Sequence, residues 1–431
     1  MSAAEMMRTF NVVGWALLII YLLSRVSVCH GAATGCSESD RKALIDFRSG
    51  IVDPEGRLHS WQGSECCQWS GVRCDNKTGA VTAIDLHNPH PYDPYSSVWY
   101  GFWNLSGRIG PSLLRLKSLR YLDLSLNTFQ GIPIPDFLGS LKELRYLNLS
   151  NAGFSGAIPA NIGNLTKLQY LDLTSVSNVL NDFNPQLIAA DIQWVTGLAS
   201  LRHLALNGVN LSSVESNWVQ VLNMLPSLTE LHLSSCSLPG SISSIQPVNF
   251  TLLKVSYRLS SNSFSMKILN WIVNVSSLVY VDVGDITGLY GRTPLGFSKL
   301  PNLRYLDLSM NNLSASCPQL LGGSWARIEI LKLFGNRIHS KIPSSLGNMT
   351  SLDELDLSNN NIKGGIPSSI GKLCNLKSLE LSNNNLDGVL PEFVQRTENY
   401  CRSGGSPLPN LISMRMSSNR LVGSLPDWRA S

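Results

Sequence analysis

Cysteine is the residue type in this chain with the clearest capacity for chemistry, and nine cysteines are present. Cys36, Cys66, Cys67 and Cys74 form the pattern C-x29-CC-x6-C. Cysteines at such spacing typically form disulfides in an oxidising compartment. We predict the pairs Cys36–Cys66 and Cys67–Cys74, although spacing alone does not fix the connectivity. A zinc site is the alternative, but it needs paired C-x2-4-C or C/H spacing, and no histidine lies in the cluster.

Of the remaining five cysteines, Cys29 lies in the predicted signal peptide and the other four lie in the second half of the chain. Cys374 and Cys401 bracket a long loop and are predicted to close it with a disulfide. Cys236 is expected to be an inert buried thiol, and Cys317 has no evident partner. The fate of both Cys236 and Cys317 stays open.

The histidines do not form a recognisable catalytic group. His59, His203, His232 and His339 are far apart in the sequence, and we find no nucleophile or carboxylate at a matched outward position. No Gly-rich phosphate loop or metal motif occurs. The sequence therefore predicts a protein that is not an enzyme and has no cofactor and no metal site.

These residues are positioned by a repeat of 24 to 25 residues with the phrase LxxLxxLxLxxN, often followed by LxGxIP. The clearest copy starts at Met349, with Leu352, Leu355, Leu357 and Asn360 in phase. Twelve copies are recognised, which start at Leu116, Leu141, Leu165, Leu198, Leu225, Phe250, Val275, Leu300, Trp325, Met349, Leu373 and Leu408. Because the sixth copy has one extra residue before Leu259 and Asn262, we expect a bulge or register slip in its strand.

A fixed short period predicts a repeat solenoid of α/β type, in which each copy packs only on its neighbours. The alternation of leucines predicts short strands that stack into one parallel β-sheet on the concave face of a right-handed leucine-rich-repeat superhelix. The GxIP segments should add second short strands on the outer wall. We divide the chain into a signal peptide (1–33), a helical disulfide-bonded cap (34–80), and the repeats (81–431), which lack a C-terminal cap.

The first 33 residues resemble a secretory signal, with Arg8, an apolar stretch at 12–23, and small residues at 31–33. No later segment is long and apolar enough to span a bilayer. We expect a chain secreted to the cell exterior or cell wall, or held at the plasma membrane if the full gene product carries an anchor. The net charge of +4 and apolar fraction of 43% do not suggest disorder or nucleic-acid binding.

Each predicted strand has two outward columns. The first column contains Tyr121, Tyr146, Tyr170, His203, Tyr280 and Tyr305, mostly preceded by arginine at 120, 145, 202 and 304, and the second contains Asp123, Asp172, Asp282, Asp307, Asp356 and Glu380. Rings beside fixed charges suit protein recognition. Equally, rings on stacked strands support one another, and the arginines offset the acidic column. Both interpretations stay open.

Two insertions interrupt the period, at 87–103 and 174–197, and insertions in solenoids often map to the binding side. The first is rich in aromatic residues. The residues that we assign to ligand binding as a hypothesis are Tyr121, Tyr146, Tyr170, Tyr280, Tyr305, Arg120, Arg145, Arg304, Asp307, Trp99, Tyr100 and Trp103.

The last position of the LxxLxxLxLxxN phrase forms a column that is often asparagine, and we expect its side chains to lie inside the coil. Asparagine occupies it at positions 127, 311, 336, 360, 384 and 419, where its amide can satisfy loop backbone groups, whereas copies two to five and seven place Ala152, Val176, Val209, Cys236 and Ile286 there.

Nine Asn-x-Ser/Thr sequons predict glycosylation at Asn76, Asn104, Asn148, Asn164, Asn210, Asn249, Asn274, Asn312 and Asn348. Those at 164, 249, 274 and 348 directly precede a copy, so their glycans should line one flank of the superhelix. Asn148 instead lies on the concave side of the sheet, where a sugar would block part of the concave surface.

The cap CSESDRKALIDFRSGIVDPEGRLHSW followed by CCQWSGVRC, the GxIP endings, and phrases such as GNLTKLQYLDL resemble plant extracellular leucine-rich-repeat receptor-like proteins. The resemblance is strongest to those similar to the receptor for fungal ethylene-inducing xylanase. It implies non-catalytic recognition of a microbial protein or peptide in plant defence, with insertions near the N-terminus contributing to ligand binding. Small-molecule substrates are not implied.

Members of this family carry more repeats, a membrane helix and a short cytoplasmic tail, and they act with membrane receptor kinases. The resemblance therefore implies such kinases, or full-length receptor-like proteins, as partners. Because this chain ends within its twelfth copy, we expect the truncated N-terminal part of an immune receptor. The alternatives are a secreted inhibitor of microbial wall-degrading enzymes, similar to polygalacturonase-inhibiting proteins, and a fragment of a developmental peptide receptor.

Overall fold

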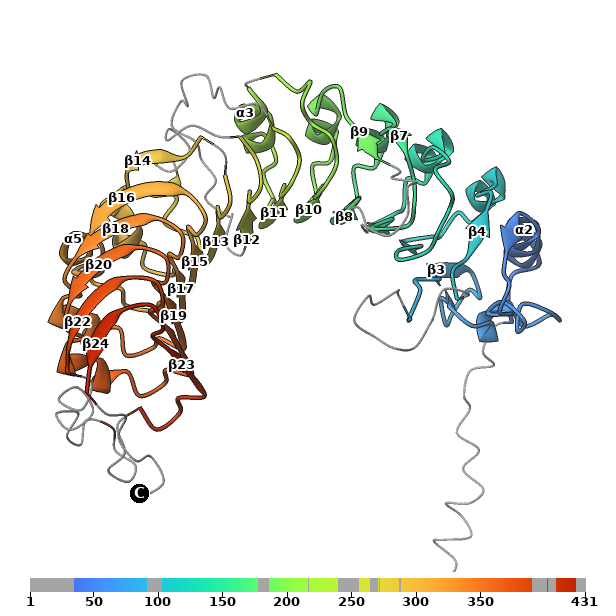
Figure 1. Ribbon diagram of the computed structural model, residues 1–431. Coiled ribbons are helices and arrows are strands. Elements are labelled where there is room, and N and C mark those ends of the chain that lie inside the picture. The colour runs from blue at the N-terminus through green and yellow to red at the C-terminus, as the bar shows by residue number, and fades with distance from the viewer. Residues whose placement is uncertain are drawn as a thin grey trace, which may run out of the picture.

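The protein is an arch of stacked coils whose inner side is lined by strands (Figure 1). The computed structural model describes residues 35–90, 103–176, 186–215, 217–238, 256–263, 270, 272–286, 288–389, 401 and 408–423. The signal peptide expected at 1–33 lies outside the described residues. No helix within the described ranges is both long and apolar enough to span a bilayer.

The N-terminal cap is built around helix α2 (Glu38–Ser49), which buries Ala43, Leu44 and Phe47. Strand β1 (Ile51–Val52) pairs antiparallel with β4 (Ser106–Gly107), and a short 3-10 helix, η1 (Cys66–Gln68), leads to β2 (Val72–Cys74). Strand β2 pairs antiparallel with β3 (Val81–Asp85), and β3 pairs in parallel with the first repeat strand. The cap therefore closes the apolar end of the coil stack.

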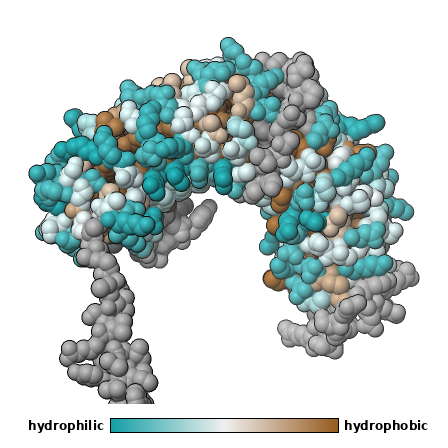
Figure 2. All heavy atoms as spheres, turned by 180° about the vertical axis from the view of Figure 1, so that it is seen from behind, coloured by the Kyte–Doolittle hydropathy of each residue, from teal (hydrophilic) through white to brown (hydrophobic). Residues whose placement is uncertain are grey.

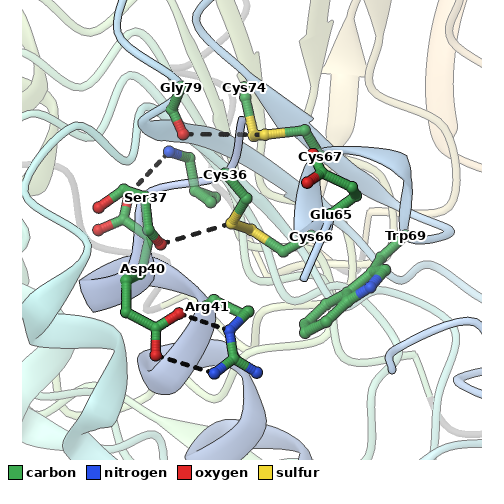
Figure 3. The surroundings of a disulfide bond; sticks show 12 residues. Cys36, Ser37, Asp40, Arg41, Glu65, Cys66, Cys67, Trp69, Cys74 and Gly79 are labelled. Carbon is green, nitrogen blue, oxygen red and sulfur yellow. Dashed lines mark hydrogen bonds and ion pairs between the residues drawn. A yellow bond between two sulfur atoms is a disulfide. The ribbon is translucent and has the colours of Figure 1, made fainter. Parts of the chain in front are cut away.

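Two disulfides hold this cap together (Figure 3). They join Cys36 to Cys66 and Cys67 to Cys74, which are the pairs predicted from spacing. A third disulfide joins Cys374 to Cys401. Because the cap sulfurs are bonded to one another, the structure does not support the zinc alternative for this cluster.

The concave face is one sheet in which the repeat strands follow one another in chain order. The strands after β3 are β5 (Tyr121–Asp123), β6 (Tyr146–Asn148), β8 (Tyr170–Asp172), β10 (His203–Ala205), β11 (Glu230–His232), β12 (Ser256–Arg258), β13 (Tyr280–Asp282), β15 (Tyr305–Asp307), β17 (Ile330–Lys332), β19 (Glu354–Asp356), β21 (Ser378–Glu380) and β23 (Ser413–Arg415). All neighbours among them pair in parallel. The predicted solenoid is confirmed, with one strand for each of the twelve copies.

The leucines that define the period form a continuous core. The tenth copy buries Leu352, Leu355 and Leu357 completely. The corresponding leucines of the first copy, Leu119, Leu122 and Leu124, are at most 1% exposed. Each fully buried leucine contributes about 1.5–3 kcal/mol through removal of apolar surface from water. Successive copies repeat this arrangement, so the core runs the length of the arch.

The outer wall combines short strands with single helical turns. The predicted second strands form a sheet of β14 (Tyr290–Arg292), β16 (Asn312–Ser316), β18 (Arg337–Ser340), β20 (Asn361–Gly364), β22 (Asn385–Val389) and β24 (Arg420–Val422), and a separate pair of β7 (Gly156–Ala157) with β9 (Leu187–Ile188). The helical turns are η2 (Pro111–Arg115), η3 (Asp136–Ser140), η4 (Ala160–Asn164), η5 (Gln193–Gly197), η6 (Leu295–Lys299), η7 (Ser344–Asn348), η8 (Ser368–Lys372), α3 (Trp218–Asn223) and α5 (Cys317–Leu321). Proline directly precedes many of these turns, where its fixed φ and missing N–H cause no loss.

The asparagine column links neighbouring copies, as its sequence position indicates. Asn360 Nδ2 donates to the carbonyls of Leu333, Leu357 and Ser358, and its Oδ1 accepts the N–H of Ile338. Asn262 of the sixth copy makes the same kind of contacts. These amides satisfy buried backbone groups that no strand or helix would otherwise pair.

Three features of the sixth copy and of the asparagine column differ from what the repeat pattern predicts or add to it. Strand β12 pairs in regular register with both neighbours, so the bulge or register slip predicted in that strand is wrong for its described residues. Val176 is 52% exposed, whereas the other apolar members of the asparagine column are buried. In place of an amide, the Cys236 thiol donates to the carbonyl of Leu206, and burial raises the pKa of this thiol to about 12.

Candidate functional site: the concave face

A stack of aromatic rings crosses the N-terminal half of the concave sheet. The ring centroids of Tyr121 and Tyr146 are 4.1 Å apart, those of Tyr146 and Tyr170 are 4.3 Å apart, and those of Tyr170 and His203 are 4.1 Å apart. The guanidinium of Arg73 lies 5.1 Å from the Tyr121 ring and closes the stack at the cap end. In-register pairing of the strands places one ring directly over the next.

The carboxylate of Asp123 joins this stack from the second outward column. It is 4% exposed and accepts hydrogen bonds from the hydroxyls of Tyr121 (3.3 Å) and Tyr146 (3.2 Å) and from the amide of Asn148 (3.2 Å). It also accepts from the backbone N–H and hydroxyl of Ser125. A residue predicted to face outward therefore lies buried beneath the rings.

The environment keeps the tyrosine hydroxyls protonated. Burial raises the pKa of Tyr121, Tyr146 and Tyr170 above the ordinary value, and the nearby carboxylates raise it further. Burial also raises the pKa of Asp172. Because the phenols remain donors at neutral pH, the rings serve the carboxylates as fixed hydrogen-bond donors.

The C-terminal half of the concave face pairs its charges internally. The ion pairs Arg304–Glu329, Lys332–Glu354, Lys377–Asp353 and Arg415–Glu380 each join adjacent copies. Tyr280 and Tyr305 stack at 3.9 Å, and the Tyr305 hydroxyl donates to Asp307. Of the residues predicted to bind ligand, Arg304 and Asp307 are therefore already engaged within the protein.

The N-terminal half differs, because its arginines have no such partners. Arg120, Arg145 and Arg202 are exposed, and within the described residues none of their side chains takes part in an ion pair. They precede Tyr121, Tyr146 and His203 in their copies. Three guanidinium groups without an ion-pair partner among the described residues thus precede these rings, and two of them, Arg120 and Arg145, act electrostatically on Glu143.

The flank of the arch seen from behind shows no single broad apolar area. Hydrophilic side chains predominate over the described residues, and hydrophobic ones lie in small groups (Figure 2). The described part of this flank therefore shows no large apolar patch of the kind that marks a docking site.

The two predicted insertions are only partly described. Trp99 and Tyr100 lie outside the described residues, whereas Trp103 is 36% exposed, and its ring lies 4.9 Å from that of His90. In the second insertion, β9 and η5 have ordinary places in the outer wall. The structure therefore does not bring Trp103 onto the ring stack by any contact within the described residues.

One cluster was missed by the sequence reasoning. His203 lies directly opposite Glu230 in the register of β10 and β11, and its Nδ1 is 2.6 Å from Glu230 Oε2. The statement that no carboxylate matches the histidines is therefore wrong. Aligning Glu230 with the tyrosine column of copies one to three was the signal that could have found this pair.

The sequons differ in how their amides are used. Asn164 and Asn348 are exposed final residues of η4 and η7, on the flank predicted for glycans, and Asn274 is also exposed. Asn249 lies outside the described residues. The amide nitrogen of Asn148, the atom that would carry a sugar, instead donates to Asp123 and to the Tyr146 hydroxyl.

We expect glycopeptide mapping of the protein secreted from plant cells to find glycans at Asn164 and Asn348 and none at Asn148. A sugar at Asn148 would replace one of the two hydrogens on the amide nitrogen, so this nitrogen could keep at most one of its two hydrogen bonds, and the sugar would displace the rings beside it. Equal occupancy of Asn148 and Asn348 in the secreted protein would contradict this prediction.

The chain matches known families over its cap and several of its copies. Residues 37–75 match the leucine-rich-repeat N-terminal domain, residues 326–386 match a leucine-rich-repeat model, and 118–141, 143–165 and 302–324 match a single-repeat model. The fold and the capped concave sheet thus define a leucine-rich-repeat protein.

Within this class, the chain resembles plant receptor-like proteins. It is 39% identical over 289 residues to receptor-like protein EIX1 of Solanum lycopersicum, covering 65% of this chain and 27% of the relative. It is 33% identical over 351 residues to receptor-like protein EIX2 of the same species, covering 77% of this chain and 34% of the relative. The chain therefore spans about a quarter to a third of the length of these relatives.

The solved structure of a plant peptide hormone receptor, RGFR1 in complex with RGF2, has the same fold. Its TM-score is 0.58 at 24% identity, and the match covers 82% of this chain and 57% of that chain. This likeness supports the solenoid architecture of the chain.

Proposed function

We propose that the chain is an extracellular recognition region of a plant receptor-like protein, and that it binds a microbial protein or peptide in immune perception. The proposal rests mainly on the concave ring stack of the N-terminal half, preceded by three arginines that have no ion-pair partner in the described part of the chain. The similarity to EIX1 and EIX2 supports a receptor role. Signalling would involve membrane receptor kinases or full-length receptor-like proteins as partners.

The geometry indicates what kind of ligand surface fits. Arg120, Arg145 and Arg202 lie in the first, second and fourth copies, and each guanidinium group can bind a carboxylate through two parallel hydrogen bonds. The edges of the half-buried rings supply contact at low cost in conformational entropy, because stacking already fixes the rings. We infer a ligand segment that presents acidic side chains next to apolar or aromatic ones.

We predict that R120A/R145A/R202A weakens ligand binding by about tenfold or more, which corresponds to about 1.4 kcal/mol. Binding of fungal ethylene-inducing xylanase and of a panel of secreted fungal proteins to the immobilised chain would be measured by surface plasmon resonance. The matched control is R292A/R337A/K363A, which removes three exposed basic side chains from outer strands β14, β18 and β20.

The proposal fails if no panel protein binds, or if the two triple variants lose affinity equally. The enzymatic activity of bound xylanase distinguishes a receptor region from an enzyme inhibitor. We expect its hydrolysis rate to be unchanged by stoichiometric chain, whereas loss of the rate on binding would favour an inhibitor.

A further inference from the structure

The cluster of His203, Glu230 and His232 lies on the concave face, where strands β10 and β11 adjoin. His203 is opposite Glu230, and His232 follows Glu230 by two residues, so all three side chains project from the same face. One possible ligand atom from each residue lies within 4.8 Å of the other two. All three residues are partly exposed, although the Nε2 atoms of both histidines are shielded from solvent.

The His203 ring is held in a defined orientation. It stacks on Tyr170 at 4.1 Å with planes 10° apart, and its Nδ1 faces Glu230 Oε2 at 2.6 Å. Its other nitrogen, Nε2, is shielded from solvent and has no hydrogen-bond partner among the described residues. The His232 ring lies 5.1 Å from the His203 ring. A stacked imidazole beside a carboxylate is a pre-oriented ligand pair.

Two imidazoles and one carboxylate are the donor set that zinc and similar transition metals use in open three-ligand sites. Ligand atoms around a tetrahedral ion of this kind lie roughly 3.4 Å apart, because each is about 2.1 Å from the metal. The His203–Glu230 contact of 2.6 Å must therefore lengthen, whereas the other separations are already no longer than 4.8 Å. Because the paired strands fix the backbone, these adjustments would come from side-chain rotation.

The charges around the cluster have both signs. Asp172 is in register with Ala205 of β10, and its charge interacts with His203, which favours a cation nearby. Arg202 precedes His203 and is exposed, and Arg258 is in register opposite His232. The carboxylates of Asp172 and Glu230 offset the positive charge of Arg202 near the cluster.

We propose that His203, Glu230 and His232 bind one divalent transition-metal ion of the zinc type. Its fourth coordination position faces the open side of the arch, where a carboxylate or imidazole of a bound protein can complete the site. Metal binding by the free chain does not depend on the proposed recognition function. Only the identity of the fourth ligand, which a bound protein would supply, rests on the proposed recognition function.

The test uses tag-free, chelator-treated chain titrated with Zn²⁺ by isothermal calorimetry. We expect one equivalent to bind, and Co²⁺ at the same site to give visible absorption bands typical of low-coordinate cobalt. H203Q/H232Q should weaken Zn²⁺ binding by at least about tenfold and remove these bands. The control is H59Q/H339Q, which removes two exposed histidines away from the concave sheet and should bind as the parent chain does.

Absence of a one-equivalent site in the parent chain would overturn the proposal, as would equal Zn²⁺ affinity in the two double variants. Where H203Q/H232Q is not secreted, E230Q takes its place, because the glutamine keeps an acceptor for His203. We expect E230Q to leave the thermal midpoint nearly unchanged and to weaken Zn²⁺ binding by about tenfold. Unchanged Zn²⁺ affinity in E230Q would contradict the proposed ligand set.

Discussion

Replacing Asn360 with leucine is expected to lower the free energy of unfolding of the C-terminal copies by about 2–4 kcal/mol. Leucine has the same branched arrangement of side-chain heavy atoms but cannot accept the buried N–H of Ile338, which asparagine satisfies at 2.9 Å. It also cannot donate to the carbonyls of Leu333 and Leu357. These carbonyls keep other amide donors, from Asn336 and Asn384, so the orphaned N–H dominates the cost.

The effect should be local, because each copy of a solenoid contacts only its neighbours. Hydrogen exchange of the variant should be faster in the copies that contain β17, β19 and β21 and unchanged in the cap. The control is N361A, which removes an exposed amide one residue further along in β20. Equal exchange in N360L and N361A would show that the asparagine column does not hold the copies together.

Much of the fold could be predicted from the sequence, because the repeat sets its own register. The leucine spacing places Leu352, Leu355 and Leu357 in the core, and the column at Asn360 follows from the same count. The disulfide pairs of the cap were also predicted. In a solenoid, each of these features depends only on distances within one copy or between adjacent copies.

The sequence predicted the site only as columns of residues, because contacts between the columns depend on side-chain conformations that the repeat period does not determine. Tyr121 and Asp123 both face outward, yet the carboxylate is buried once the rings of two copies lie over it. The His203–Glu230 pair joins copies of unequal length, in which the period no longer shows which residues are opposite. Counting back from the inward leucines Leu204 and Leu231 would have aligned them.

Replacing Asp123 with alanine is expected to destabilise the N-terminal copies by about 3 kcal/mol. The change leaves two tyrosine hydroxyls, the Asn148 amide and the Ser125 N–H without their common acceptor. The ring stack of Tyr121, Tyr146 and Tyr170 should then loosen. Chemical denaturation and the near-ultraviolet circular dichroism of the tyrosines would measure the two consequences.

The matched control is D356A, because Asp356 accepts from the backbone N–H and hydroxyl of Ser358, as Asp123 does from Ser125. Two residues before Asp356, on the same face of the strand, lies Glu354, where the first copy has Tyr121. We expect D356A to cost about 1 kcal/mol, so that the difference of about 2 kcal/mol reports the ring contacts. If both variants lose the same stability and the tyrosine signal is unchanged, the rings are held by stacking alone, and the concave face owes no part of its order to the buried carboxylate.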